Sequence, residues 1–486
     1  MRFILVSMLS TALTPLAYAE THFSADIGVA TVYADNIELA APDGKSSGSV
    51  VVDINPVLRM TQDSARFKSA LSYQAHSFSF LEDSDFNTTY HQGDGSASWT
   101  ALPDWLTLNA IAGYDQRIVD PTRATSSDRL FSTGNLSDTA SASISPRILH
   151  RFGGIQLAAS YTYGVVDYKN DPADFGGSID ITALDDSKDQ SAQFSLGSAP
   201  NDEWQRFGWE VGYNWEHTSY DVSLPYEYAR ASLLTSIGLS SGFSLLAEGG
   251  RESDLVTSTV DGGLSETYWR GGFRYAPDSR TSLQLMYGDR FFGTTYSGRF
   301  THRASRLEIS LGYSEEPTTE GRQILRRDTA PGSIVPPPPG IDITRSTSEP
   351  FISKQLDGEL RLKGRVTTIY LRIASDRQDF LRTESTDRVR AATVGMQRVL
   401  GARTVLDIGA STARTEFRDG SNGIDNDVAI SLNRRVSRTF VIGGVARYLD
   451  RWGSGLDDYR AWSVGIQVRK SFGSGAVATL PATSVR

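Results

Sequence analysis

The sequence contains no cysteine, which excludes disulfides, thiolate metal sites and a lipid anchor on an N-terminal cysteine. Histidine is scarce as well, and the 6 residues are scattered without the paired spacing of a metal-dependent hydrolase. No uninterrupted apolar run of about 18 residues follows the N-terminal segment, so the sequence contains no candidate transmembrane helix. These absences leave no catalytic residue, metal ligand or cofactor motif from which an enzymatic function could be predicted.

The N-terminal segment has the organisation of a secretory signal peptide. Arg2 supplies the positive charge, the run from Phe3 to Leu16 is apolar, and Ala17 and Ala19 fit the small residues before a cleavage site. We therefore predict a signal peptide over residues 1–19 that is removed on export. Export of a large chain without cysteine is typical of the Gram-negative cell envelope.

The charge balance is acidic, with 48 Lys and Arg residues against 57 Asp and Glu and a formal net charge of -9. An acidic chain argues against nucleic acid as a partner. The hydrophobic fraction of 39% and the mean hydropathy of -0.29 resemble those of a soluble protein. A transmembrane β-barrel has the same average composition, because only alternate residues of its strands face lipid.

Apolar and polar residues alternate with a period of two, and the stretch from 283 to 313 shows this most clearly. In its first part Leu283, Leu285 and Tyr287 share one face, whereas Met286 and Arg290 share the other. Successive side chains of a strand point to opposite faces of a sheet, so this period predicts strands. Most of the chain repeats the pattern, which favours one large sheet over several domains.

Short and long connections alternate along the chain. The short ones, such as 240–242 and 304–305, carry the residues that tight turns need, whereas 120–136 and 317–349 are long. Short turns at one end and long loops at the other are typical of outer-membrane barrels. The predicted fold is all-β, an antiparallel up-and-down transmembrane β-barrel of about 22 strands (range roughly 18–24) with no N-terminal plug domain.

These patterns divide the chain into a signal peptide, a barrel over residues 20–472 and a C-terminal tail over residues 473–486. The longest loop, 317–349, contains a proline-rich segment at 334–340 that favours an extended polyproline conformation. Gly293 to Thr295 form the one short connection expected on the long-loop side. The rim of the barrel should therefore be lowest there.

Charged residues fall on the face opposite the apolar one. The residues predicted to line the lumen are Glu210, Arg230, Glu248, Arg270, Arg274, Arg290, Arg299, Glu308, Arg372 and Arg447. An arginine facing lipid at mid-depth would cost about 2 to 4 kcal/mol. The sequence leaves open whether this lining is a salt-bridged support or a wet path. Arg388 and Arg390 break the pattern because they share parity with Val394, and turning them inward would require a β-bulge.

Tryptophan gathers near both ends of the predicted strands. Trp99, Trp105 and Trp204 flank short turns, and Trp215, Trp269 and Trp452 lie nearer the long loops. Two such bands are expected of the aromatic girdles at the two membrane interfaces. We therefore predict that the protein resides in the cell outer membrane.

Residues 287–316 resemble a family of outer-membrane β-barrels associated with exosortase (PEP-CTERM) systems, through the run from Tyr287-Gly-Asp-Arg to Ser314-Glu-Glu. The final strands, from Arg434 through Tyr448 to Phe472, resemble β-barrel porins found with exopolysaccharide genes. The resemblance implies a barrel linked to exopolysaccharide production and export, without catalytic residues. The tail after Phe472 departs from the terminal aromatic residue that the assembly machinery reads.

Three functions remain open at this point. The first is a porin-like channel for exopolysaccharide export, and the second is a structural or surface-interaction barrel without a transport role. The third is an enzyme barrel, to which only the spacing of Gly44, Ser46 and Gly48 in a loop points. The expected partners are outer-membrane lipid and lipopolysaccharide, the barrel assembly machinery, a polysaccharide cargo and periplasmic export proteins. No nucleic acid and no cofactor are expected.

Overall fold

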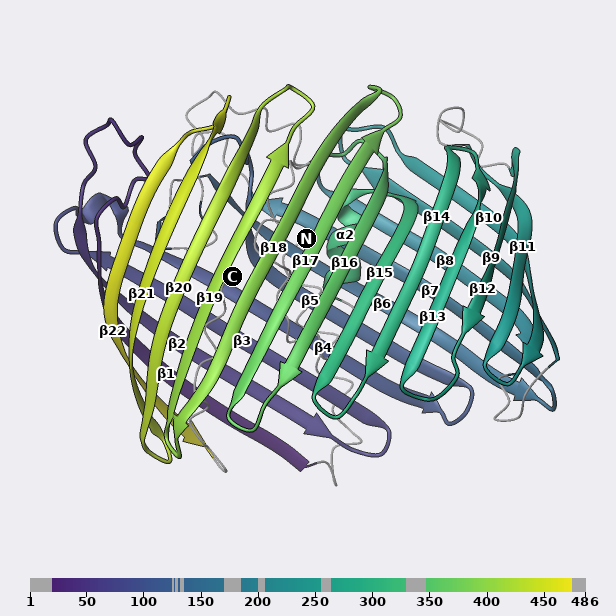
Figure 1. Ribbon diagram of the computed structural model, residues 1–486, viewed down its shortest axis with the longest axis horizontal. Helices are drawn as coiled ribbons and strands as arrows, with labels where there is room; N and C mark the ends of the chain where they lie inside the picture. The colour runs from purple at the N-terminus through teal and green to yellow at the C-terminus, as the bar shows by residue number, and fades with distance from the viewer. Residues whose placement is uncertain are drawn as a thin grey trace.

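The computed structural model describes residues 20–124, 126, 130–131, 135–169, 185–199, 206–254, 264–328 and 347–473. The chain forms one closed sheet of 22 antiparallel strands (Figure 1). They are β1 (Glu20–Ala34), β2 (Ser49–Asp63), β3 (Phe67–Phe80), β4 (Thr88–Leu102), β5 (Leu106–Ile118), β6 (Leu136–Phe152), β7 (Ile155–Lys169), β8 (Ser187–Ser198), β9 (Phe207–Tyr220), β10 (Tyr226–Ser240), β11 (Phe243–Glu252), β12 (Glu266–Tyr275), β13 (Thr281–Arg290), β14 (Gly293–Arg303), β15 (Leu307–Thr318), β16 (Phe351–Lys363), β17 (Thr367–Phe380), β18 (Ser385–Gly401), β19 (Thr404–Glu416), β20 (Asn422–Ser437), β21 (Phe440–Ser454) and β22 (Tyr459–Gly473).

Each strand pairs with its neighbours in sequence, and β1 pairs with β22 to close the barrel. The closing register runs from Ser24 opposite Gly473 to Ala34 opposite Ser463. Closure satisfies the backbone hydrogen bonds that an edge strand would leave unpaired. The predicted signal peptide (1–19), the proline-rich segment (334–340) and the tail beyond Gly473 lie outside the described residues. No helix in the described part of the chain is long and apolar enough to cross a membrane.

Short turns gather at one end of the barrel and longer connections at the other. Gly153 and Gly154 alone join β6 to β7, and Gly153 adopts a φ of 59° that favours glycine. At the other end, residues 35–48 join β1 to β2, whereas Phe291 and Phe292 alone join β13 to β14. The short link between β13 and β14 agrees with the sequence pattern, but its predicted position was wrong, because Gly293 to Thr295 belong to β14. It is not unique, however, because residues 381–384 make another short link between β17 and β18.

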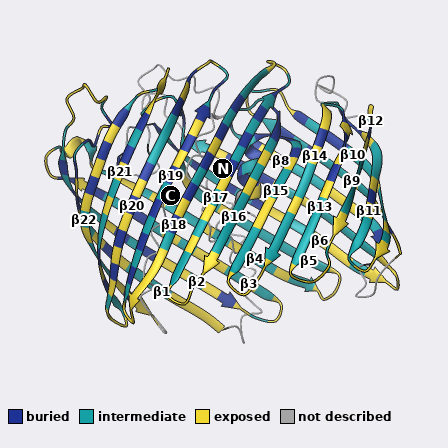
Figure 2. Cartoon of the chain, in the orientation of Figure 1, coloured by how far each residue is buried: buried dark blue, intermediate teal, exposed yellow. Residues whose placement is uncertain are grey.

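The two faces of the sheet differ in burial, as the banding along the strands in Figure 2 shows. On β13, Leu285 and Tyr287 are 43% and 49% exposed on the outer face, whereas Met286 is 7% exposed on the inner face. Large exposed apolar side chains recur on the outer face of most strands. A continuous apolar outer surface of this kind fits a lipid environment, because burial in lipid removes it from water.

The predicted fold class is wrong about the interior of the barrel. Part of segment 317–349 does not remain a loop, because Glu320–Asp328 form helix α2, which packs against the inner side of β5–β8. The amide of Arg322 donates to the hydroxyl of Thr319, which caps the helix, and Glu320 stands favourably in its first turn. Ile324 and Leu325 are buried in a cluster with Val166 of β7. The lumen is therefore narrowed by a helix that strand periodicity could not predict.

The arginines of β18 face outward without any bulge to turn them. The register between β17 and β18 runs without interruption from Thr367 opposite Arg398 to Phe380 opposite Ser385. Between β18 and β19 the only shift lies at the turn end, between Val399 and Gly401. Arg388 and Arg390 therefore keep the parity that the sequence gives them, on the outer face.

Candidate functional site

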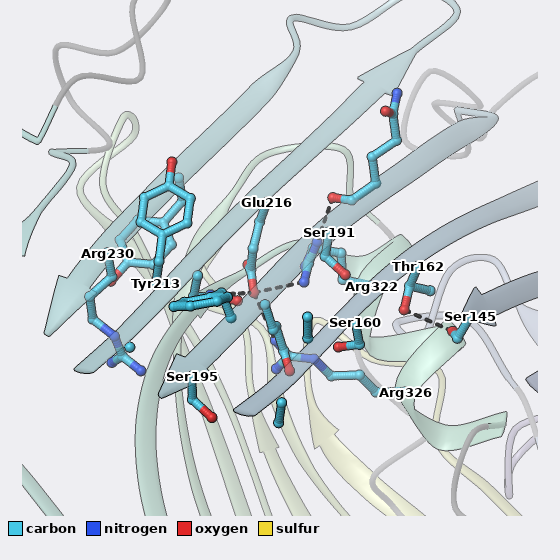
Figure 3. A pocket seen from close by; sticks show the side chains of 18 of the residues that line it. Ser145, Ser160, Thr162, Ser191, Ser195, Tyr213, Glu216, Arg230, Arg322 and Arg326 are labelled. Carbon is cyan, nitrogen blue, oxygen red and sulfur yellow. Dashed lines mark hydrogen bonds and ion pairs between the residues drawn. The ribbon is translucent and has the colours of Figure 1, made fainter. Parts of the chain in front are cut away.

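A cavity of about 890 Å³ lies on the inner side of β6–β10, beside α2 (Figure 3). Much of its wall consists of hydroxyl groups, which we call the hydroxyl wall. Its members are Ser143 and Ser145 of β6, Ser160 and Thr162 of β7, Ser191 and Ser195 of β8, and Ser232 of β10. They meet there because each has the inner parity of its strand, and adjacent strands bring these positions side by side. Ser145 and Thr162 are hydrogen-bonded at 2.8 Å.

Helix α2 forms one side of the cavity and is fixed to the opposite strand by charge. Glu216 of β9 is only 3% exposed and lies 2.7 Å from Arg322 and 3.3 Å from Arg326, both on α2. We call these three residues the α2 latch. A buried carboxylate needs charged or hydrogen-bonding partners, which the two guanidinium groups provide. The latch and the apolar contact of Leu325 together hold α2 against the wall.

A smaller cavity of about 160 Å³ lies where Ile324 of α2 faces the inner side of β3–β6. Its lining is polar, and Gln92 donates to Asp115 at 2.7 Å. Tyr114, which also lines it, donates to Asp138 at 2.7 Å. Helix α2 therefore contributes to the lining of two polar spaces within the lumen.

A buried ion cluster borders the larger cavity near the long-loop end of β10–β15. Arg290 is fully buried and contacts Glu252 at 2.8 Å and Glu316 at 3.1 Å. It also donates to the hydroxyl of Tyr228 at 2.7 Å, and Arg230 lies 3.7 Å from Glu316. We call these five residues the Arg290 cluster. Such a network is rigid because every shift of one member would leave a buried charge without its partner.

The remaining charged residues predicted from the sequence are spread around the barrel. Glu248 and Arg270 form a close ion pair at 2.6 Å, and Glu210 borders the larger cavity. The others are placed as follows: Arg274 donates to Gln284 at 2.9 Å, Glu308 pairs with Lys363 at 2.6 Å, Arg372 with Glu359 at 3.4 Å and Arg447 with Asp427 at 3.0 Å, and Arg299 lies opposite Gly312. The structure thus places Arg230 and Arg290 together in one cluster at the border of the cavity. The other predicted residues lie apart from this cluster.

The tryptophans predicted to form girdles lie near both strand ends. Trp99 and Trp105 are exposed by the turn between β4 and β5. Trp269 and Trp452 are exposed toward the long-loop end, and the indole of Trp215 donates to Glu227 at 2.8 Å. Trp204 lies outside the described residues.

The sequence alone did not identify the α2 latch. Glu216 shares the parity of Glu210 on the same strand, so its inward direction could be recognised from the pattern. Arg322 and Arg326 could not, because they belong to a segment that was predicted to be a loop. No group of three or more His, Asp or Glu residues in the described ranges is arranged to hold a metal ion.

No protein-family model matches the chain, and no curated protein sequence matches it. Solved structures of similar architecture include the FrpB iron transporter of Neisseria meningitidis, the siderophore receptor PirA of Pseudomonas aeruginosa, and a mutant ferric enterobactin receptor, PfeA, of the same species. Their identities are 9%, 11% and 10%, with TM-scores of 0.47, 0.46 and 0.48. The matches cover 93%, 93% and 92% of this chain and 83%, 80% and 81% of those chains. Similarity at this level carries no argument about ligands.

The predicted fold class differs from these structures in one respect. The sequence favoured a barrel without a plug domain, whereas the barrels that resemble this one have plug domains. A barrel of 22 strands encloses a lumen wide enough to hold a folded domain. Strand number and a polar lining therefore do not decide what fills the lumen. Within the described ranges, α2 is the helix that lies inside the barrel.

Proposed function

We propose that the protein is an outer-membrane transport barrel with a path for a hydrophilic, polyhydroxylated solute. The observation that carries this proposal is the hydroxyl wall, a cluster of uncharged hydrogen-bonding groups on the inner faces of β6–β8 and β10. The apolar outer surface supports a membrane location. Neutral hydroxyl groups exchange weak hydrogen bonds at similar energy, so a solute can pass from one to the next.

A carbohydrate is the solute class that this lining suits best. Its hydroxyl groups both donate and accept, as serine and threonine hydroxyls do. Arg230 and Arg326, at the border of the cavity, add donors that can orient sugar oxygens. The resemblance of residues 287–316 to barrels of exosortase systems supports an exopolysaccharide as the carbohydrate. Deleting the gene should lower secreted polysaccharide, and unchanged export would reject exopolysaccharide as the cargo.

Sugar flux through the purified barrel tests the transport proposal itself. We expect liposomes that contain the protein to swell in maltooligosaccharide solutions. Ser191→Leu should slow swelling because it replaces a hydroxyl of the wall with a larger apolar group. The control is Ala192→Leu, the next residue of β8, which has outer parity. Equal flux through both variants would contradict a path along the hydroxyl wall.

A structural barrel without a transport role is the second candidate. The α2 latch and the Arg290 cluster favour it, because both place fixed side chains inside the lumen. Conductance in planar bilayers distinguishes the two functions. A protein that is silent as wild type and also after Glu216→Gln would support the structural barrel, whereas current through either form would support transport.

A further inference from the structure

Five basic side chains stand side by side on the outer face of β16–β19. They are Lys354 of β16, Arg377 of β17, Arg388 and Arg390 of β18, and Arg414 of β19. The register places Lys354 opposite Arg377, Arg377 opposite Arg388, and Arg390 opposite Arg414. We call these residues the basic row.

The basic row begins where the apolar outer surface of these strands ends. Val394 is 50% exposed and pairs with Ala410. Toward the long-loop end, Arg390 lies four positions beyond Val394 and Arg414 lies four positions beyond Ala410. On β17, Ile373 is exposed with the same parity as Arg377. The row therefore lies on the lipid-facing surface at the height where the hydrocarbon region gives way to lipid headgroups.

Acidic neighbours compensate the basic row only in part. Its ion pairs are Arg377–Asp379 at 2.7 Å, Lys354–Asp379 at 3.2 Å, Arg414–Glu416 at 3.0 Å and Arg388–Glu416 at 3.9 Å. Glu315 of β15 stands opposite Lys354 and accepts a hydrogen bond from Tyr313. Five basic groups thus face three carboxylates, and Arg390 has no ion pair or hydrogen bond to the described part of the chain. Like charges directly opposite each other on neighbouring strands are destabilising, so a bound anion would stabilise the row.

We infer that the basic row binds the phosphate groups of a phosphorylated glycolipid in the leaflet at the long-loop end. Guanidinium groups present several N–H donors in a plane that matches phosphate oxygens. A lipid is the occupant that fits, because the row adjoins the lipid-facing surface and the acyl chains would lie against Val394 and Ile373. The inference rests on the barrel spanning a membrane and not on what passes through it.

Lipid retention by the full-length purified protein tests this inference. The protein is placed in phosphatidylcholine nanodiscs that contain either bis-phosphorylated lipid A or lipid A stripped of both phosphates, and bound lipid is counted by native mass spectrometry. We expect retention of the phosphorylated form only. The double variant Arg390→Gln and Arg414→Gln should weaken it by at least about tenfold, because charge-assisted hydrogen bonds are lost.

The matched control is Arg398→Gln, which changes an arginine on the same face of β18 at the short-turn end. Retention unaffected by the double variant, or equally reduced by Arg398→Gln, would overturn the inference. Displacement of the lipid by inorganic phosphate at equal concentration would also overturn it, because the site would then recognise a free anion.

Thermal stability offers a second readout that a misfolded variant cannot imitate. In detergent without glycolipid, the double variant should melt at or above the wild-type temperature, because repulsion between facing arginines is removed. Adding bis-phosphorylated lipid A should raise the melting temperature of the wild type and leave that of the double variant unchanged. An equal rise in both proteins would contradict binding at the basic row.

Discussion

Two regions of the inner surface border the same cavity but differ in chemistry, one on β6–β8 and β10 and the other reaching from β10 and β15 to β11 and β13. The first carries the hydroxyl wall, whose side chains are neutral and can both donate and accept hydrogen bonds. The second carries the Arg290 cluster, in which Arg290 and Glu252 are both fully buried and bonded to each other. The hydroxyl wall can exchange hydrogen bonds with a solute, whereas the Arg290 cluster holds fixed ion pairs.

This difference indicates how a charged lumen should be interpreted. A buried ion network resists rearrangement, because moving one charge away leaves its partner buried without a compensating charge. Charges of this kind keep the strands in register and fix the shape of the cavity. Passage of a solute then depends on the neutral groups between them.

Removing one charge from the Arg290 cluster should cost the most stability. Glu252→Leu leaves Arg290 buried without its closest carboxylate, and we expect the free energy of unfolding to fall by about 3 to 5 kcal/mol. Urea titration of the barrel in vesicles measures the change. The double variant Glu252→Leu with Arg290→Met should recover most of the loss. A double variant as unstable as the single one would contradict a cluster that acts through paired charge.

Opening the α2 latch should have a smaller effect on stability and a larger one on conductance. Glu216→Gln removes the carboxylate that binds Arg322 and Arg326, and we expect a loss of about 2 kcal/mol. Release of α2 should join the two cavities and raise single-channel conductance several-fold. The control is Glu227→Gln on the outer face of β10, beside the register position of Glu216. Equal conductance of both variants would show that α2 does not restrict the lumen.

A steric change should loosen the same helix without altering charge. A Cβ added at Gly164 of β7 would overlap a methyl group of Leu325, so Gly164→Val should cost about 1 to 3 kcal/mol and also raise conductance. At Gly249 of β11 the nearest atom to an added Cβ is a backbone oxygen at 3.7 Å, which makes Gly249→Val the control. If Gly164→Val leaves conductance unchanged, the helix is not held by this contact.

The smallest effect on stability is expected from an exposed carboxylate in a turn. The backbone amides of Arg280 and Thr281 donate to Asp278 at 2.9 and 2.7 Å and lower its pKa. A lowered folded-state pKa stabilises the fold at neutral pH, and this contribution is lost as the pH falls through that pKa. Asp278→Ala should therefore lower stability slightly at neutral pH and have no effect in acid. Ser279→Ala, the control, should leave stability unchanged at both pH values. A difference that persists in acid would contradict this origin.

The sequence predicted the parts of the structure that depend on local pattern. Alternation from Leu283 to Tyr287 separated the two faces of β13, and turn composition located short links such as the one at 304–305. Ion pairs such as Glu248 with Arg270 depend on the register between strands, which a single strand does not reveal. Helix α2 was missed because strand periodicity does not apply to a segment that enters the lumen.

The direction of the arginines on the outer face of β18 could not be predicted from strand parity alone. The cost of placing Arg390 toward lipid favoured a bulge that would turn it inward. That cost applies at mid-depth and falls toward the interface. Because β18 runs beyond the apolar surface, Arg390 can keep its outer parity at little cost. Depth in the membrane, which strand parity alone does not define, decides between the two placements.

The most direct test of the central claim is the interruption of single-channel current by a maltooligosaccharide. The claim is that the hydroxyl wall binds the passing solute while the buried charges hold the shape. We predict current blocks in the wild type that shorten several-fold in the double variant Ser160→Ala and Ser191→Ala. Arg447→Met, which breaks an ion pair with Asp427 outside the lining of the cavity, should leave their duration unchanged. Blocks that are insensitive to the two serines and abolished by Arg447→Met would contradict the account.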